Sequence, residues 1–187
     1  MKPQFDPKTG VLFVVIETPK GSRNKFDWDF ERKAFVLGGV LTAGASFPYD
    51  FGFAPGTLGQ DGDPLDVLVL MDEPAFSGCL VESRLIGVIE AEQTERDGET
   101  MRNDRFIAVA QSSHLFCELH ALDDLAGNLV DEIEHFFVSY NAIKGKKFQL
   151  LARGDAARAA DLILEGQAAE RKSKAKKRRA SATKKPQ

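Results

Sequence analysis

The sequence predicts an α+β fold, mainly β, in which helices pack on a closed or nearly closed barrel. Two observations predict it. Up to about residue 110, short apolar or alternating stretches are separated by Gly and Pro, which is typical of barrel strands. After residue 120, apolar residues recur at helical spacing instead. The hydrophobic share of 43%, with 14 Phe, is enough for a real core and excludes a disordered chain.

Residues 11–18 are apolar until Glu17 and are followed by Pro19, which predicts a buried strand that ends there. Residues 26–30 alternate with a period of two, as in a half-buried strand. The full set of expected strands is Val11–Thr18, Phe26–Phe30, Phe35–Leu41, Val67–Met71, Leu80–Glu90 and Arg105–Ala110.

Two helices are expected at the C-terminal end. Asp123 or Asp124 is suited to cap the first, and Gly145 is suited to end it. The second covers Ala156–Ala169 and has a weaker apolar face. The apolar positions of the first helix are Leu125, Leu129, Ile133, Phe136, Phe137 and Tyr140.

Charge divides the chain into an expected domain, residues 1–170, and a basic disordered tail, residues 171–187. The tail carries nine Lys and Arg and no acid; removing these from the 25 basic residues leaves 16 against 28 acidic ones. Such an acidic body repels phosphate unless metal ions reverse the local sign. The tail has no aromatic residues for stacking on bases, so nucleic acid is not the expected partner, with weak electrostatic contact as the alternative.

The expected location is the cytoplasm, without membrane association. No apolar run reaches the roughly 18 residues that a bilayer requires. The N-terminus lacks the features of a secretory signal. Cys79 and Cys117 lack metal-ligand spacing and do not suggest a disulfide framework.

The segment from Asp61 to Asp66, D-G-D-P-L-D, places three carboxylates within six residues, directly before a strand. At ~4 Å, two like charges cost about 1 kcal/mol in water and about 4 kcal/mol at an effective dielectric constant near 20. A folded turn with this composition therefore needs a counter-ion, and hard carboxylate oxygens suit Mg²⁺ or Mn²⁺. A solvated acidic turn is the alternative. A calcium loop is disfavoured because Leu65 replaces an oxygen ligand.

This segment resembles the soluble family I inorganic pyrophosphatases, whose motif D-G-D-P-x-D it matches in full. The resemblance covers about residues 11–165. Other stretches that resemble the family, in the same order, are Val14–Pro19, Lys25–Asp27, Phe47–Phe53, His135–Tyr140 and Lys144–Lys146.

The resemblance implies a five-stranded OB-like barrel with two C-terminal helices. It also implies hydrolysis of inorganic pyrophosphate to two phosphates with several Mg²⁺ ions, and a homo-oligomer, a hexamer or smaller. By the same resemblance, Asp61 and Asp66 bind the activating metals, Glu17 helps to hold further metals, and Asp63 accepts the proton of the attacking water. The resemblance also implies that phosphate oxygens are contacted by Lys25, Tyr140 and Lys146.

The sequence departs from the family pattern mainly where the family binds phosphate. Gly39 stands where an Arg is expected, Phe47 and Phe51 replace two Tyr, and Asn141 replaces a Lys. Asp27 replaces a Glu, which shortens that side chain by one methylene.

The family also supplies two Asp and a Lys from a hairpin, D-x-x-x-x-D-x-K. Here the region is longer and differently ordered. If Arg105 matches the Lys, the nearer Asp becomes Asn103, and a local shift makes Asp104 the expected metal ligand. Glu92 or Asp97 is expected to replace the other Asp.

Three functional hypotheses follow. The first is a divergent metal-dependent pyrophosphatase, with turnover lowered by these departures. The second is a scaffold that keeps the fold and binds metal or phosphoryl ligands without efficient hydrolysis. The third is an unrelated barrel whose basic tail assists contact with oligonucleotides.

Overall fold

The computed structural model describes residues 5–183, in which five strands form a closed ring. Around the ring they are β2 (Val11–Thr18), β5 (Asp50–Phe53), β6 (Asp66–Leu70), β9 (Arg105–Ala110) and β7 (Leu80–Thr94), and β7 pairs back with β2. β6 and β9 are parallel, whereas the other ring pairs are antiparallel. The predicted five-stranded barrel is thereby confirmed.

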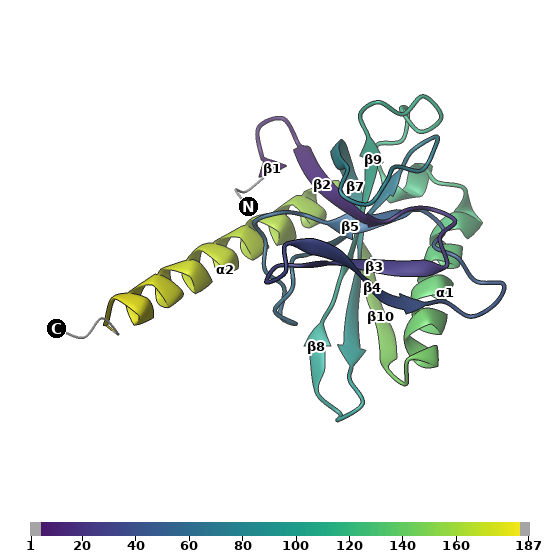
Figure 1. The fold of residues 1–187 in the computed structure, drawn as a ribbon. Helices are drawn as coiled ribbons and strands as arrows, with labels where there is room; N and C mark the ends of the chain where they lie inside the picture. Colours follow the sequence, from purple (N-terminus) through teal and green to yellow (C-terminus); the bar gives the residue numbers. More distant parts are fainter. Residues whose placement is uncertain (1–4, 184–187) are drawn as a thin grey trace.

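The other strands lie at the edges of this ring or over it. β1 (Phe5–Asp6) extends it beside β2, and β8 (Thr100–Arg102) and β10 (Lys147–Gly154) extend it beside β7. β3 (Asn24–Asp29) and β4 (Ala34–Val40) form a separate hairpin, which lies across the barrel in Figure 1.

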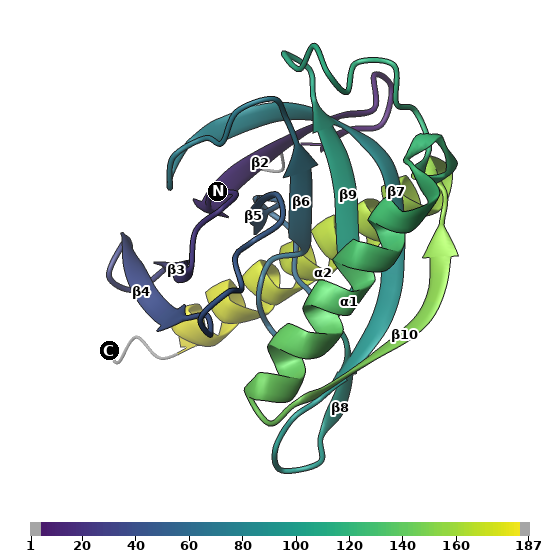
Figure 2. The ribbon, with the colours of Figure 1, turned by 90° about the vertical axis from the view of Figure 1, so that its right-hand side faces the viewer.

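A short 3₁₀ helix, η1 (Leu122–Asp124), precedes two α-helices, α1 (Gly127–Ile143) and α2 (Ala156–Thr183). In Figure 2, α1 lies in front of β9 and β7, while α2 crosses behind the barrel. Among residues 5–183, no helix combines the length and the hydropathy needed to cross a bilayer.

Both faces of the central strands are buried, in two separate apolar cores. Val67 and Val69 of β6 pack in a core with Ile163 of α2, while Leu68 and Leu70 pack in a core with α1 residues. This alternation follows from the two-residue period of a strand. Each fully buried aliphatic side chain contributes about 1.5–3 kcal/mol to the free energy of folding. The two apolar cores therefore hold both helices against the barrel.

The expected strands are all present, and two have the predicted bounds, Val11–Thr18 and Arg105–Ala110. The sequence did not predict β1, β5, β8 or β10, and the first three of these are only two to four residues long. In β5, a Cβ atom at Gly52 would lie 2.0 Å from the carbonyl oxygen of Val15. Glycine therefore allows β5 to approach β2 closely.

The expected start of the first helix was wrong. The Asp124 carboxylate accepts hydrogen bonds from the backbone N–H groups of His120 and Ala121, both at 2.8 Å, and so stabilises η1. α1 begins only at Gly127.

The expectation of a disordered tail was also wrong for residues 171–183, which continue α2 to Thr183. Ala, Lys and Arg, which dominate this segment, are strong helix formers. Lys174 adds an ion pair with Glu170 one turn earlier, at 2.8 Å. This part of α2 projects away from the barrel (Figure 1). Residues 184–187 of the expected tail lie outside the described residues.

Candidate active site

A cavity of about 470 Å³ lies beside the β3–β4 hairpin, the acidic loop 59–66, the β7–β8 hairpin and the C-terminal end of α1. The side chains that line it come from segments far apart in the sequence. Seven of the eight predicted site residues line this cavity: Glu17, Lys25, Asp61, Asp63, Asp66, Tyr140 and Lys146.

The acidic loop is held in a tight turn by its own hydrogen bonds. The N–H of Gly59 donates to the carbonyl of Asp63 at 2.7 Å, and the N–H of Asp63 donates to the Asp61 carboxylate at 3.1 Å. Gly62 has a φ of +92°, which favours glycine. Burial raises the pKa of both Asp61 and Asp66, and the charge of Asp63 adds to this effect. The loop thus concentrates negative charge at the cavity.

Asp66 begins β6 and pairs in register with Arg105, which begins the parallel strand β9. Their side chains form an ion pair of 2.7 Å. The Arg105 guanidinium also lies over the rings of Phe137 and Phe148, 4.9 and 5.2 Å from their centroids. The sequence had singled out Arg105 only as the match to the family's lysine; the structure places it in the cavity.

Glu17 connects the barrel to the β3–β4 hairpin. Its carboxylate accepts a hydrogen bond of 2.6 Å from the N–H of Trp28. Lys25 lies 3.8 Å from the other oxygen of Glu17 and also pairs with Asp27. Burial raises the pKa of Glu17 to about 7, although Lys25 and the Trp28 N–H act in the opposite direction. Glu17 therefore has less positive charge around it than a buried carboxylate needs.

The C-terminal end of α1 supplies the opposite wall. Tyr140 stacks on Phe136, and its hydroxyl accepts a hydrogen bond from Lys144. Burial raises the pKa of Tyr140, so its hydroxyl stays protonated at neutral pH. Lys146 pairs with Glu95 at 2.8 Å. Lys144 had no role in the sequence prediction, although its spacing of four residues from Tyr140 puts both on one helix face.

Asp104 is the predicted site residue that the structure does not bring into this cavity. Because side chains alternate along an extended strand, Asn103 and Arg105 face the cavity while Asp104 points elsewhere. The Asp104 carboxylate accepts hydrogen bonds from the N–H of Ala91, at 2.9 Å, and from Arg102, at 2.8 Å. Asp104 lines a neighbouring cavity together with Asp61 and Asp66, so its expected role as a metal ligand stays a prediction.

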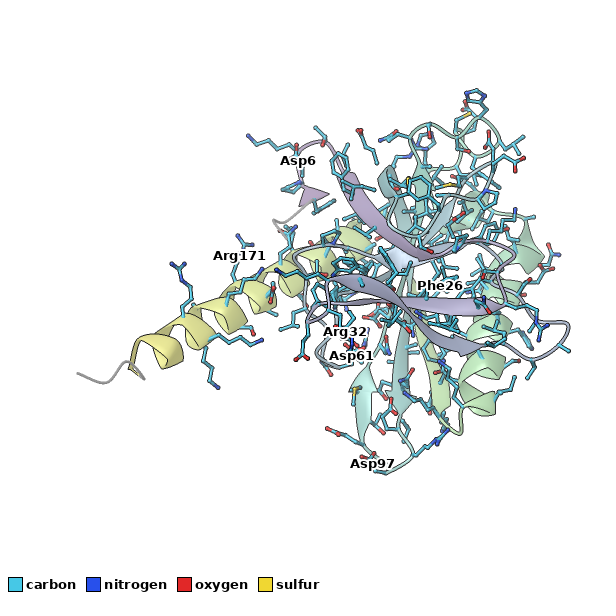
Figure 3. The ribbon with its side chains drawn as sticks, viewed as in Figure 1. Asp6, Phe26, Arg32, Asp61, Asp97 and Arg171 are labelled. Carbon is cyan, nitrogen blue, oxygen red and sulfur yellow. The ribbon has the colours of Figure 1, made fainter. Side chains whose placement is uncertain are left out.

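The alternatives in the same hairpin are also outside the cavity. Glu92 does not line it, and Asp97 lies at the tip of the β7–β8 hairpin, away from Asp61 (Figure 3). The side chains that do face the cavity from this hairpin include Gln93 and Asn103. Glu95 also lines the cavity from this hairpin, so one carboxylate and two neutral amides stand where the family resemblance had implied two carboxylates.

The departures in phosphate binding have a clear structural outcome. Phe47 and Phe51 line the cavity with rings that lack a hydroxyl. The Asn141 amide donates to the carbonyl of Phe137 at 2.9 Å, so it is turned back onto its own helix. Gly39 lies opposite Lys25 in the hairpin, with open space beside its Cα.

The comparisons with known proteins agree with this fold. Residues 14–171 match the family described as inorganic pyrophosphatase. The inorganic pyrophosphatase of Synechocystis sp. is 40% identical over 149 residues, which cover 80% of this chain and 85% of that protein. That of Halalkalibacterium halodurans is 39% identical, with 86% of this chain and 94% of that protein covered. The crystal structure of the Thermus thermophilus inorganic pyrophosphatase superimposes with a TM-score of 0.82 at 32% identity, covering 91% of this chain and 97% of that one.

Proposed function

This chain belongs to the inorganic pyrophosphatase family, and we propose on that premise that it hydrolyses inorganic pyrophosphate to two phosphates with the help of Mg²⁺. Mn²⁺ is the alternative cation. One observation supports this most: Glu17, Asp61, Asp63 and Asp66 line the same cavity as Lys25, Tyr140 and Lys146. Such a site offers oxygen ligands for cations and donors for phosphate.

The chemistry of the donor set fits a hard divalent cation. No His or Cys is among the side chains that line the cavity, and its acids are carboxylates. Burial raises the pKa of Glu17, Asp61 and Asp66 even though Lys25 and Arg105 act in the opposite direction, so a bound cation would stabilise their charged forms. Over residues 5–183, no three His, Cys, Asp or Glu side chains are gathered tightly enough to hold an ion by themselves. Water and the phosphate substrate, which Mg²⁺ commonly keeps as ligands, are therefore part of the proposed site.

Asp61 and Asp66 would hold the cation, and Glu17 would hold a further one. When bound, these ions lower the pKa of a water molecule and screen the charge of the substrate. Asp63 is proposed to accept the proton of the attacking water. The oxygen of this water bonds to one phosphorus, the bridging P–O bond breaks, and the second phosphate leaves.

The positive wall is proposed to bind and orient the phosphates. Lys25 and Lys146 act as charged donors, each of which is already held in place by a carboxylate. Tyr140 acts as a neutral donor because its raised pKa keeps the hydroxyl proton in place. Donors that are fixed before the substrate arrives stabilise developing charge most effectively.

A binding scaffold is the second candidate, because the cavity shows Phe47, Phe51 and Asn141 where the family resemblance implies donors. Each missing charged contact costs about 1.5–3 kcal/mol if it acts in the transition state. Since ~1.4 kcal/mol is a factor of ten, two or three such losses lower the rate by several orders of magnitude.

Release of phosphate from pyrophosphate in the presence of Mg²⁺ separates the two candidates. The hydrolase predicts turnover that Asp63→Asn abolishes, because the substitution removes the base and keeps the size of the side chain. Mg²⁺ binding with no turnover above that of the Asp63→Asn variant favours the scaffold. A cytoplasmic location and a homo-oligomer are part of the proposal.

A further inference from the structure

Lys144 differs from the other basic residues of the cavity in how its charge is balanced. Four cations line the cavity: Lys25, Arg105, Lys144 and Lys146. Lys25 pairs with Asp27, Arg105 with Asp66 at 2.7 Å, and Lys146 with Glu95 at 2.8 Å. Within the described part of the chain, no carboxylate lies within ion-pair distance of Lys144.

The helix holds the Lys144 side chain at the cavity. Lys144 is the C-cap residue of α1 and keeps helical backbone angles, φ −79° and ψ −1°. It therefore lies on the same face as Tyr140, four residues earlier. Its Nζ donates to the Tyr140 hydroxyl and lies 4.1 Å from the centre of the ring. An ammonium has three N–H donors, so two remain for a ligand in the cavity.

The charge of Lys144 is also partly desolvated. The residue is half-buried, and burial, followed by the charge of Lys25, lowers its pKa; Lys146 acts in the same direction, and Asp27 and Glu95 oppose it. A half-buried ammonium without a paired carboxylate favours an anion from solution. Pyrophosphate and phosphate are anions of this kind.

The position of Lys144 relates it to the missing lysine of the family pattern. That lysine is expected directly after Tyr140, where this chain has Asn141. The Asn141 side chain is bonded to its own helix and brings no charge to the cavity. Lys144 lies three residues further on, which is one helical turn and the same face.

We infer that Lys144 binds a phosphate group of the substrate and supplies the cation that Asn141 does not. The inference rests on the proposed function, because it identifies a substrate-binding residue of the same cavity. The role is binding, so the affinity for phosphate ligands should depend on Lys144 more than the chemical step does.

The test compares Lys144→Gln with Lys147→Gln. Both substitutions remove one positive charge, but the Lys147 ammonium is bonded to Gln149 outside the cavity. Trp28, the single Trp of the chain, lines the cavity, so its fluorescence reports the binding of pyrophosphate or inorganic phosphate without turnover. The expected result is a dissociation constant for both probes that rises roughly tenfold or more in Lys144→Gln, the size of one charge-assisted hydrogen bond. Lys147→Gln should change it less than about twofold, as exposed charges do.

Lys144→Arg keeps the positive charge and should recover most of the affinity. In Lys144→Gln, KM for pyrophosphate should rise by a larger factor than kcat falls. Equal effects of Lys144→Gln and Lys147→Gln on the dissociation constant would overturn the inference. It would also be overturned if Lys144→Arg is folded by far-UV circular dichroism and does not recover affinity. If Lys144→Gln does not fold, the Lys144→Met variant is used in its place. Lys144-dependent binding without any turnover would refute the proposed hydrolysis but not this inference. Normal turnover with unchanged KM and affinity in Lys144→Gln would refute this inference but not the proposed hydrolysis.

Discussion

Asp66 and Arg105 are register partners at the first residues of two parallel strands, and their side chains meet at 2.7 Å beside the cavity. The Arg105 side chain is 5% exposed and the Asp66 side chain 24%, so the arginine is buried and the carboxylate is partly buried. Removing the arginine leaves a partly buried carboxylate without its cation. Removing both charges leaves no carboxylate without a cation.

We therefore expect Arg105→Met to lower the free energy of unfolding by about 3–5 kcal/mol, as for other broken buried pairs. Adding Asp66→Asn to this variant should recover part of the loss. Urea unfolding of the two single variants and the double variant gives the coupling energy. Strictly additive losses would show that the two side chains do not stabilise each other.

Glu90 makes a second ion-pair cluster, whose residues do not line the cavity. Its carboxylate lies 2.9 Å from Arg158 and 2.6 Å from Arg102. Hydrogen bonds from Arg158, then from Arg102, lower the pKa of Glu90 from 4.5 to about 2. The pKa is lower in the folded state, so the stabilisation is complete above pH 4.5 and is lost as the pH falls towards 2.

Glu90→Gln is expected to lower the free energy of unfolding at pH 7 by on the order of 2 kcal/mol, less than the full pKa shift implies, because solvent screens the exposed Arg158. The difference from the unmodified protein should shrink steadily between pH 4.5 and pH 2. Urea unfolding at a series of pH values measures it. A difference that stays constant over this range contradicts the assigned ion pairs.

Gly52 should be intolerant of any side chain. A Cβ atom there would lie 2.0 Å from the Val15 carbonyl oxygen and 2.8 Å from its carbon, both backbone atoms that cannot rotate away. We expect Gly52→Ala to cost more than about 3 kcal/mol or to prevent folding. Gly39→Ala, where the new Cβ meets open space, is the control and should melt within a few degrees of the unmodified protein.

Gly39→Arg tests whether the departures from the family pattern limit turnover. Gly39 pairs with Lys25 across the β3–β4 hairpin, and directly paired residues point to the same face of a sheet. A guanidinium at this position would reach the side where Lys25 lines the cavity. We expect kcat/KM for pyrophosphate to rise roughly tenfold, the value of one charged donor. Gly39→Gln, which has similar reach and no charge, should give little gain.

The sequence was sufficient to predict the barrel and most of the cavity. Short apolar runs identified β2 and β9, and the dense carboxylates of loop 59–66 pointed to the need for a counter-ion. Glu17, Lys25, Tyr140 and Lys146 were predicted through the family resemblance, and the structure brings them to the same cavity.

The differences between the sequence prediction and the structure have physical reasons. In the β7–β8 hairpin, a shift of one residue reverses which side chains face the cavity, and the sequence did not show that Asp104 is held by Ala91 and Arg102. Lys144 was missed because the prediction matched motif positions and did not follow the helix one turn past Asn141. The helical extension after Ala169 was missed because charge alone was taken to indicate disorder.

The most direct test is the initial rate of phosphate release from pyrophosphate as a function of Mg²⁺ concentration, for the unmodified protein and for Asp61→Asn. The carboxylate loop is proposed to bind the activating cation, so the rate should saturate with Mg²⁺, and Asp61→Asn should need at least about ten times more Mg²⁺ for half the maximal rate. A rate that persists in the presence of EDTA, or the same Mg²⁺ dependence in both proteins, would contradict the proposal.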